Sequence, residues 1–165
     1  MIEMDSSDLI ESTVTSTRVR LARNLFSYPF PDKLDEKRAR EIIRVVGYEL
    51  NRLDTFTEYD IGKIEPDEAT FLLEKHLISP DLIRRKSISA AFITSDEEIS
   101  VMINEEDHLR EQYILRGCNL YKAYERISGI DDGIGRSVSF AYDEKLGYLT
   151  ACPSNLGTGM RASVM

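Results

Sequence analysis

Two short runs rich in β-branched residues, 88–94 and 99–104, are separated by only four polar residues, SDEE. This pattern predicts an antiparallel hairpin. A second hairpin is predicted for residues 137–142 and 148–152, on either side of the turn sequence DEKLG. Helical patterns interleave with the hairpins without a regular βαβ rhythm. The sequence therefore predicts an α+β domain with a mostly antiparallel sheet flanked by helices.

Two helices are predicted before the first hairpin. Apolar residues recur at helical spacing in 35–53, and Asp35 is suited to be the N-cap. The second helix is predicted for 66–76, with His76 at its end and a stop at Ser79–Pro80. A histidine in this position usually interacts with the helix dipole or the last carbonyls, which is a purely structural role.

A third helix is predicted for residues 106–127, where an apolar stripe recurs at helical spacing. Cys118 would lie within this helix as a buried small residue. The next stretch, 128–136, is punctuated by glycines and predicts a loop in which Asp131 and Asp132 are turn residues.

Arginines alternate with apolar residues in a predicted strand at 14–21. Because side chains alternate between the faces of a strand, Ser16, Arg18 and Arg20 would share one face. Val19 and Leu21 would point into a core. The mutual repulsion of the two guanidinium groups could be relieved by solvent and acidic neighbours, or by a polyphosphate, which arginine binds bidentately.

The last fourteen residues, CPSNLGTGMRASVM, combine a thiol, glycines and an arginine. Gly157 and Gly159 permit close backbone approaches, so a loop here could direct N–H groups, Cys152 and Arg161 toward one anion. A polar connection without function is an equally good local interpretation.

Three carboxylates crowd the sequence NEEDHLR, at the junction between a predicted strand and a predicted helix. Glu105, Glu106 and Asp107 could serve only as partners of the helix dipole. An acidic junction directly after a strand, with Arg110 one turn further on, is less ordinary.

Composition narrows the class of protein. The 165 residues suffice for one domain with a core, and the net charge of −8 argues against binding to nucleic acid or anionic membranes. No apolar run approaches the roughly 18 residues needed to span a bilayer, and the acidic N-terminus does not resemble a signal peptide. Two cysteines without metal-ligand spacing predict neither a disulfide framework nor a metal site. We expect a cytoplasmic protein.

The predicted core is apolar and drawn from all these elements. It comprises Val19, Leu21, Ile42, Val46, Leu50, Phe92, Ile93, Val101, Leu120 and Phe140.

Four stretches, STRVR at 16–20, His76, NEEDHLR at 104–110 and CPSNLGTGMRASVM at 152–165, stand in an order and spacing that resemble the catalytic domain of the phosphagen (ATP:guanido) kinases. This resemblance implies their glutamine-synthetase-like fold. The bacterial protein-arginine kinases are the most similar branch. STRVR lies almost at the N-terminus, which leaves no room for the helical N-terminal domain of arginine and creatine kinases, and EKHLISPDL also looks like the bacterial branch.

The resemblance implies transfer of the γ-phosphoryl group of ATP to a guanidinium nitrogen of arginine side chains in proteins. An arginine clamp would neutralise the phosphates, and Mg²⁺ would bridge them through water, without a dedicated protein site. The residues expected to bind nucleotide are Ser16, Thr17, Arg18, Val19, Arg20, His76, Arg110, Arg161, Ala162, Ser163, Val164 and Met165.

Two residues carry the chemistry by resemblance. Glu106 matches the carboxylate that orients the nucleophilic nitrogen and accepts its proton. Cys152 matches the reactive cysteine near the guanidinium, whose thiolate would help to steer a cationic substrate. Glu105 and Asp107 are expected to support them.

The resemblance covers residues 1–165 as the N-terminal portion of a catalytic domain and stops at RASVM. The family continues with further strands, another arginine and a second substrate carboxylate, so we expect this truncated chain to be inactive. Its exposed sheet edge would favour a homodimer. Two alternatives stay open: a kinase of free arginine or another small guanidino compound, and a non-catalytic module that binds nucleotide or a partner.

Overall fold

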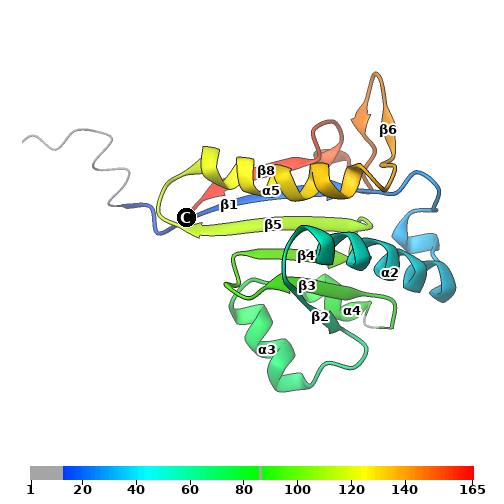
Figure 1. The fold of residues 1–165 in the computed structure, drawn as a ribbon, viewed down its shortest axis with the longest axis horizontal. Helices are drawn as coiled ribbons and strands as arrows, with labels where there is room; N and C mark the ends of the chain where they lie inside the picture. Colours follow the sequence, from blue (N-terminus) through cyan, green and yellow to red (C-terminus); the bar gives the residue numbers. More distant parts are fainter. Residues whose placement is uncertain (1–12, 86) are drawn as a thin grey trace, which may run out of the picture.

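The computed structural model describes residues 13–85 and 87–165. Its centre is a six-stranded sheet in the order β2-β3-β4-β5-β1-β8, in which every neighbouring pair is antiparallel (Figure 1). The predicted α+β fold is thereby confirmed. The strands are β1 (Ser16–Arg23), β2 (Phe56–Asp60), β3 (Ala90–Thr94), β4 (Ile99–Ile103), β5 (Leu109–Arg116) and β8 (Met160–Val164).

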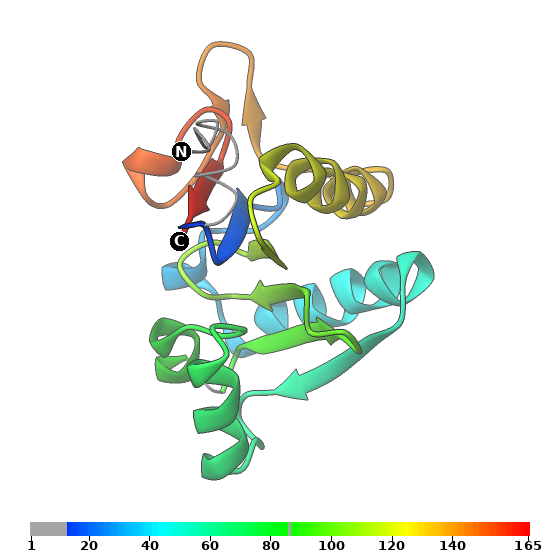
Figure 2. The same ribbon diagram turned by 90° about the vertical axis from the view of Figure 1, so that its left-hand side faces the viewer.

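Helices cover the two faces of the sheet unequally (Figure 2). α2 (Glu36–Leu53) and α5 (Leu120–Gly135) pack on one face over the main apolar core. α3 (Pro66–Glu74) and α4 (Pro80–Arg84) lie on the other face, where a second apolar cluster joins them to β3 and β4. Neither of these two helices extends over β5, β1 and β8, so that part of the face is left to polar side chains.

The alternation predicted for the arginine-bearing strand is confirmed, although β1 begins and ends two residues later than expected. Val19 and Leu21 are buried in the main core, and Thr17 is buried on the same side. Arg18 and Arg20 are half-buried on the opposite face. The strand therefore separates its core residues from its cationic ones.

Most of the predicted core is buried, but Leu120 is 44% exposed because it begins α5. Phe140 is only partly buried, at the margin of the main core. The other eight predicted core residues are buried.

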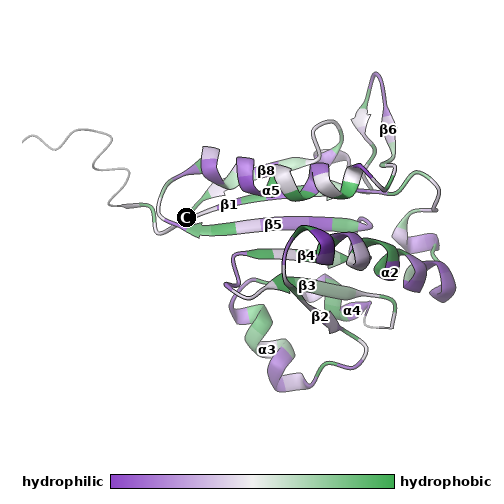
Figure 3. Cartoon of the chain, in the orientation of Figure 1, coloured by the Kyte–Doolittle hydropathy of each residue, from purple (hydrophilic) through white to green (hydrophobic). Residues whose placement is uncertain are grey.

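The predicted helix 106–127 is wrong in its first half, which contains β5 at the centre of the sheet. Leu109 and Tyr113 are four residues apart, and this spacing places two side chains on one face of a helix and also of a strand. Both face the main core. The middle of β5 is hydrophilic and lies between more hydrophobic parts of the strand (Figure 3), whereas β3 and β4 are buried along their whole length.

The predicted loop 128–136 is also wrong, because α5 continues to Gly135. Asp131 is a buried helical residue that forms an ion pair with Arg23, with 2.7 Å between Oδ2 and Nη2. Cys118 lies before α5 rather than within a helix, and it is half-buried.

The N-terminus of α2 has the predicted cap, whereas the residues after α3 do not have the predicted roles. Asp35 accepts a hydrogen bond from the Arg38 N–H, as an N-cap does. α3 ends at Glu74, so His76 lies beyond it, with a φ of 59°. Ser79 and Pro80 do not stop a helix but begin α4, where Ser79 is the N-cap.

The second predicted hairpin exists in a shorter form, β6 (Tyr142–Asp143) with β7 (Gly147–Tyr148), and it projects from the sheet (Figure 1). Residues 137–141 instead run beside the end of β1: Leu25 bridges Phe140, and the Ala141 N–H donates to the Asn24 carbonyl. The hairpin is followed by a short 3₁₀ turn, Pro153–Asn155, and then by β8. None of the described helices is both long and apolar enough to cross a membrane.

Candidate functional site

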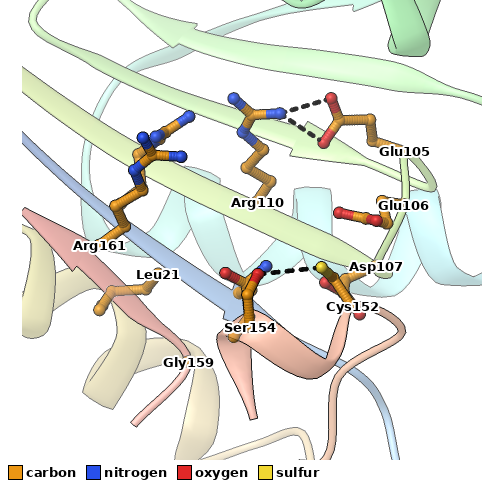
Figure 4. A pocket seen from close by; sticks show the side chains of 12 residues that line it. Leu21, Glu105, Glu106, Asp107, Arg110, Cys152, Ser154, Gly159 and Arg161 are labelled. Atoms are coloured by element: carbon orange, nitrogen blue, oxygen red, sulfur yellow. Dashed lines mark hydrogen bonds and ion pairs between the residues drawn. The ribbon is translucent and has the colours of Figure 1, made fainter.

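A cavity of about 220 Å³ opens on the sheet face that α3 and α4 leave uncovered. Three of the four stretches singled out in the sequence meet there (Figure 4). The lining residues that carry charge, a thiol or a hydroxyl are Arg20, Glu105, Glu106, Asp107, Arg110, Cys152, Ser154 and Arg161.

The strand register brings the arginines together. Arg20 of β1 lies directly opposite Arg161 of β8. Ala22, two residues further along β1 and on the same face, lies opposite Arg110 of β5. Arg18 shares this face and lies opposite Ser163. Directly opposite residues of antiparallel strands present their side chains on the same side. The four predicted clamp arginines therefore form one cationic surface.

This surface is poorly neutralised by the protein itself. Burial, and then the positive charges of Arg110, Arg18 and Arg161, together lower the pKa of Arg20 to about 10. The pKa of Arg18 is lowered as well, by burial and then by Arg110 and Arg161. The Nε of Arg18 and the Oγ of Ser163 are buried without a hydrogen-bond partner among the described residues. A bound anion would accept hydrogen bonds from these groups and would reduce the repulsion among the arginines.

Glu105 is the carboxylate that pairs with this cationic surface. Its side chain is buried, and its two oxygens accept hydrogen bonds from Nη1 of Arg110 at 2.6 and 2.9 Å. The hydroxyl of Ser79 also donates to Glu105. Ser79 is the N-cap of α4, so this helix, Glu105 and Arg110 form one connected polar group.

Glu106 is exposed to the cavity and forms no ion pair within the described ranges (Figure 4). Its pKa is raised, first by partial burial and then by the negative charges of Asp107 and Glu105. An unpaired carboxylate with a raised pKa is suited to bind a cation and to accept a proton.

Cys152 lies at the start of the Pro153–Asn155 turn, half-buried at the edge of the cavity. Its Sγ is 3.0 Å from the Oγ of Ser154. A hydroxyl at this distance can donate a hydrogen bond to the sulfur.

Asp107 and His108 connect the acidic turn, residues 105–107, to neighbouring segments. Oδ1 of Asp107 accepts hydrogen bonds from the Asn24 Nδ2, at 2.6 Å, and from the Ala151 N–H, at 2.7 Å. His108 is fully buried; its Nδ1 accepts from the Leu25 N–H, so its Nε2 is the donor to the Pro29 carbonyl. Burial lowers the pKa of His108 to about 4, so the imidazole is neutral.

Sequence reasoning missed Asn24, whose only signal was its position three residues after the predicted arginine strand. It also missed β8, which turns Arg161 into a direct neighbour of Arg20.

The remaining predicted nucleotide residues lie outside the cavity. Ser16 lines a different hollow of about 470 Å³, together with Lys75 and Leu77 on either side of His76. His76 is exposed, and its carbonyl accepts a hydrogen bond from Gln112 Nε2 at 2.6 Å. The side chains of Thr17 and Val19 are on the opposite, buried face. In the register of β8 these two strand residues lie opposite Val164 and Ala162, and Met165 follows the strand.

Residues 38–165 match the family described as ATP:guanido phosphotransferase, C-terminal catalytic domain. The chain belongs to this family. A protein-arginine kinase of Clostridium acetobutylicum is 48% identical over 165 residues, covering 97% of this chain and 48% of that protein. One from Caldanaerobacter subterraneus subsp. tengcongensis is 44% identical over 160 residues, covering 94% of this chain and 48% of that protein.

A solved structure of this family has the same fold. The substrate-free duplicated taurocyamine kinase from Schistosoma mansoni superimposes with a TM-score of 0.85 at 28% identity, covering 99% of this chain and 25% of that one. This ATP:guanido phosphotransferase chain spans about half the length of the curated relatives it matches.

Proposed function

We propose that this chain is the catalytic part of a protein-arginine kinase, which transfers the γ-phosphoryl group of ATP to a guanidinium nitrogen of arginine side chains in proteins. The observation that carries the proposal is the juxtaposition of four arginines on one sheet face with the unpaired carboxylate of Glu106 and the thiol of Cys152. One part of the cavity is suited to polyphosphate and the other to a cation. The curated relatives at 44–48% identity are named protein-arginine kinases.

On the nucleotide side, Arg18, Arg20, Arg110 and Arg161 would hold the phosphates of ATP. Phosphoryl transfer depends mainly on positioning and on neutralising the charge of the phosphates, and guanidinium groups supply both. Mg²⁺ would bind as part of the nucleotide, where it withdraws charge from the phosphate oxygens. Among residues 13–85 and 87–165 we find no group of three acidic, histidine or cysteine side chains suited to hold a metal ion.

On the acceptor side, Glu106 would bind the guanidinium and accept its proton as the N–P bond forms and the bond between the γ-phosphorus and the bridging oxygen of ATP breaks, which releases ADP. A guanidinium has a pKa above about 12, so its nitrogen is a poor nucleophile unless a nearby base takes the proton. Cys152, with Ser154 beside it, would contact the other side of the cation.

A second candidate is a kinase of a small guanidino compound. It is favoured by the likeness to the taurocyamine kinase structure, although that likeness is only 28% in sequence. Both candidates use the same clamp and differ only in the acceptor.

The deciding experiment incubates the full natural protein with ATP and Mg²⁺, and offers either an arginine-rich protein or free arginine. We expect acid-labile phosphoarginine on the protein acceptor, and its loss in Glu106→Gln. Phosphorylation of free arginine alone would establish the second candidate. Nucleotide binding without transfer to either acceptor would contradict both and leave a binding module.

A further inference from the structure

Asn24 lies immediately after β1, is buried, and uses its side chain for three hydrogen bonds. Its Nδ2 donates to Oδ1 of Asp107 at 2.6 Å and to the carbonyl of Leu149 at 3.1 Å. Its Oδ1 accepts from the N–H of His108 at 2.9 Å. One amide thus contacts both the acidic turn and the segment that leads to Cys152.

The main chain of Asn24 ties the same segments together. Its carbonyl accepts from the Ala141 N–H at 2.7 Å, and the Ala141 carbonyl accepts from the Leu149 N–H at 2.9 Å. Asp107 completes the connection, because the oxygen that receives the Asn24 amide also accepts from the Ala151 N–H. We call Asn24, Asp107 and Ala151 the turn clamp.

The turn clamp lies between the two groups that face the acceptor. Glu106 directly precedes Asp107, and Cys152 directly follows Ala151. In the part of the chain that the structure describes, residues 150–155 make their other hydrogen bonds among themselves or with Leu156. The hydrogen bond from the Ala151 N–H to Asp107 therefore connects the turn that contains Cys152 to the acidic turn.

We propose that Asn24 is a positioning residue for the acceptor site: through Asp107 and Leu149 it sets the spacing between Glu106 and Cys152. The catalytic consequence rests on the function proposed above, whereas the effect on Cys152 does not. A guanidinium held between a base and a sulfur requires both at fixed positions, and small displacements of reacting groups cost large factors in rate.

The chemistry of an amide explains why asparagine suits this position. Asp107 offers only acceptors and the His108 N–H is only a donor, so the residue between them must both donate and accept. Alanine would leave the His108 N–H and part of the Asp107 carboxylate without partners in a buried site. Aspartate would bring two carboxylates within hydrogen-bond distance, where they can bond only by sharing a proton.

The test uses the full natural protein with Asn24→Ala and Asn24→Asp. The rate of Cys152 alkylation by iodoacetamide is measured by peptide mass spectrometry, with Cys118 as the internal reference. Affinity for MgATP and the KM for an arginine-rich protein acceptor are measured in parallel. We expect at least a threefold change in the Cys152 rate, an unchanged Cys118 rate, a tenfold or greater loss of kcat/KM for the acceptor, and ATP affinity within twofold of wild type.

Asn24→Asp adds a reversible readout. As the pH falls from 8 to 5.5, the introduced carboxylate and Asp107 can share a proton, so the ratio of variant to wild-type Cys152 rates should return toward one. This arm also serves if Asn24→Ala does not fold. The matched controls are Asn51→Ala and Asn51→Asp, because Asn51 is exposed on α2 and, within the described part of the chain, its amide bonds only the Gly47 carbonyl. They should change none of these quantities.

Unchanged Cys152 reactivity in folded Asn24→Ala would overturn the inference. An equal loss of ATP affinity would also overturn it, because Asn24 would then support the domain as a whole. If the wild-type protein transfers no phosphoryl group while the Cys152 rates change as expected, the proposed function fails and the turn clamp stands.

Discussion

Arg20 and Arg161 lie directly opposite each other on β1 and β8, with both guanidinium groups on the same face of the sheet. Side chains paired in this way have Cβ atoms about 4.5–5.5 Å apart, and like charges there destabilise the sheet. No carboxylate of the described residues forms an ion pair with either arginine. The pairing of these two arginines therefore favours the state with a bound anion over the state without one.

Replacing Arg20 with alanine should have two effects of opposite sign. Without nucleotide, the free energy of unfolding should stay the same or rise, because repulsion from Arg161 is removed. The affinity for MgATP should fall tenfold or more, since a charge-assisted hydrogen bond contributes about 1.5–3 kcal/mol. Urea unfolding and calorimetry of the full natural protein measure the two effects.

Arg84→Ala is the control for this prediction. Arg84 is an exposed arginine of α4 that pairs with Asp81, so its loss should leave ATP affinity unchanged. Undiminished ATP affinity in Arg20→Ala would show that the arginine surface is not the nucleotide site.

The convergence of the cavity residues could be predicted because its parts have strong local signals. The alternation in the arginine strand predicts which face Arg18 and Arg20 share, and the sequence strings around Glu106 and Cys152 resemble those of one family. β5 could not be distinguished from a helix, because Leu109 and Tyr113 satisfy both periods. Its strand conformation follows from pairing with β4 and β1, which a local pattern does not contain.

Long-range partners explain the other errors. Asp131 has the sequence context of a turn, yet it is buried against Arg23, 108 residues earlier. Asn24 is one polar residue among many, and its role depends on segments that lie 83 and 125 residues away. Such roles arise only when the sheet assembles.

Glu106→Gln and Glu105→Gln should separate catalysis from support. Glu106→Gln should reduce arginine phosphorylation at least about 100-fold, the lower range for loss of a general base, with ATP affinity nearly unchanged. Glu105→Gln should be milder for transfer but should lower the free energy of unfolding by about 1–3 kcal/mol, because the charge facing Arg110 in a partly buried bond is lost. Steady-state kinetics and urea unfolding measure the two.

The pH dependence of transfer adds to this comparison. Because the pKa of Glu106 is raised above its ordinary value, kcat/KM should begin to fall at a higher pH than for an ordinary glutamate as the pH decreases. If Glu105→Gln impairs transfer more than Glu106→Gln does, the two roles are reversed.

His108 should make stability depend on pH below neutrality. The folded protein keeps the imidazole neutral down to about pH 4, whereas the unfolded chain binds a proton near pH 6.5. Between these values the unfolded state holds more protons, so this contribution is complete above pH 6.5 and is lost as the pH falls toward 4. The loss is roughly 3 kcal/mol.

Urea unfolding between pH 7.5 and 4 measures this slope. His108→Gln should lower stability at pH 7.5 and flatten the slope. An identical slope in His108→Gln and the wild type would show that the stability loss comes from other groups.

Gly117 and Gly159 provide a matched pair, because both have positive φ, 77° and 58°, and only one is confined. A Cβ on Gly117 would meet nothing within 4 Å, whereas one on Gly159 would lie 2.5 Å from Nη1 of Arg23 and 2.6 Å from the Ala22 carbonyl oxygen. That oxygen belongs to β1 and cannot move without disturbing the sheet. Substitution at Gly159 must therefore shift the start of β8, and Arg161 with it.

Gly117→Ala should lower the free energy of unfolding by about 1–2 kcal/mol, the cost of a left-handed backbone for alanine. Gly159→Ala should cost that amount and about 1–3 kcal/mol more from overpacking. Only Gly159→Ala should weaken MgATP binding, because only it displaces Arg161 from Arg20. Urea unfolding and calorimetry compare the variants in the full natural protein. Equal destabilisation, or equal ATP affinity, in the two variants would mean that the contact between Gly159 and β1 does not hold Arg161 in place.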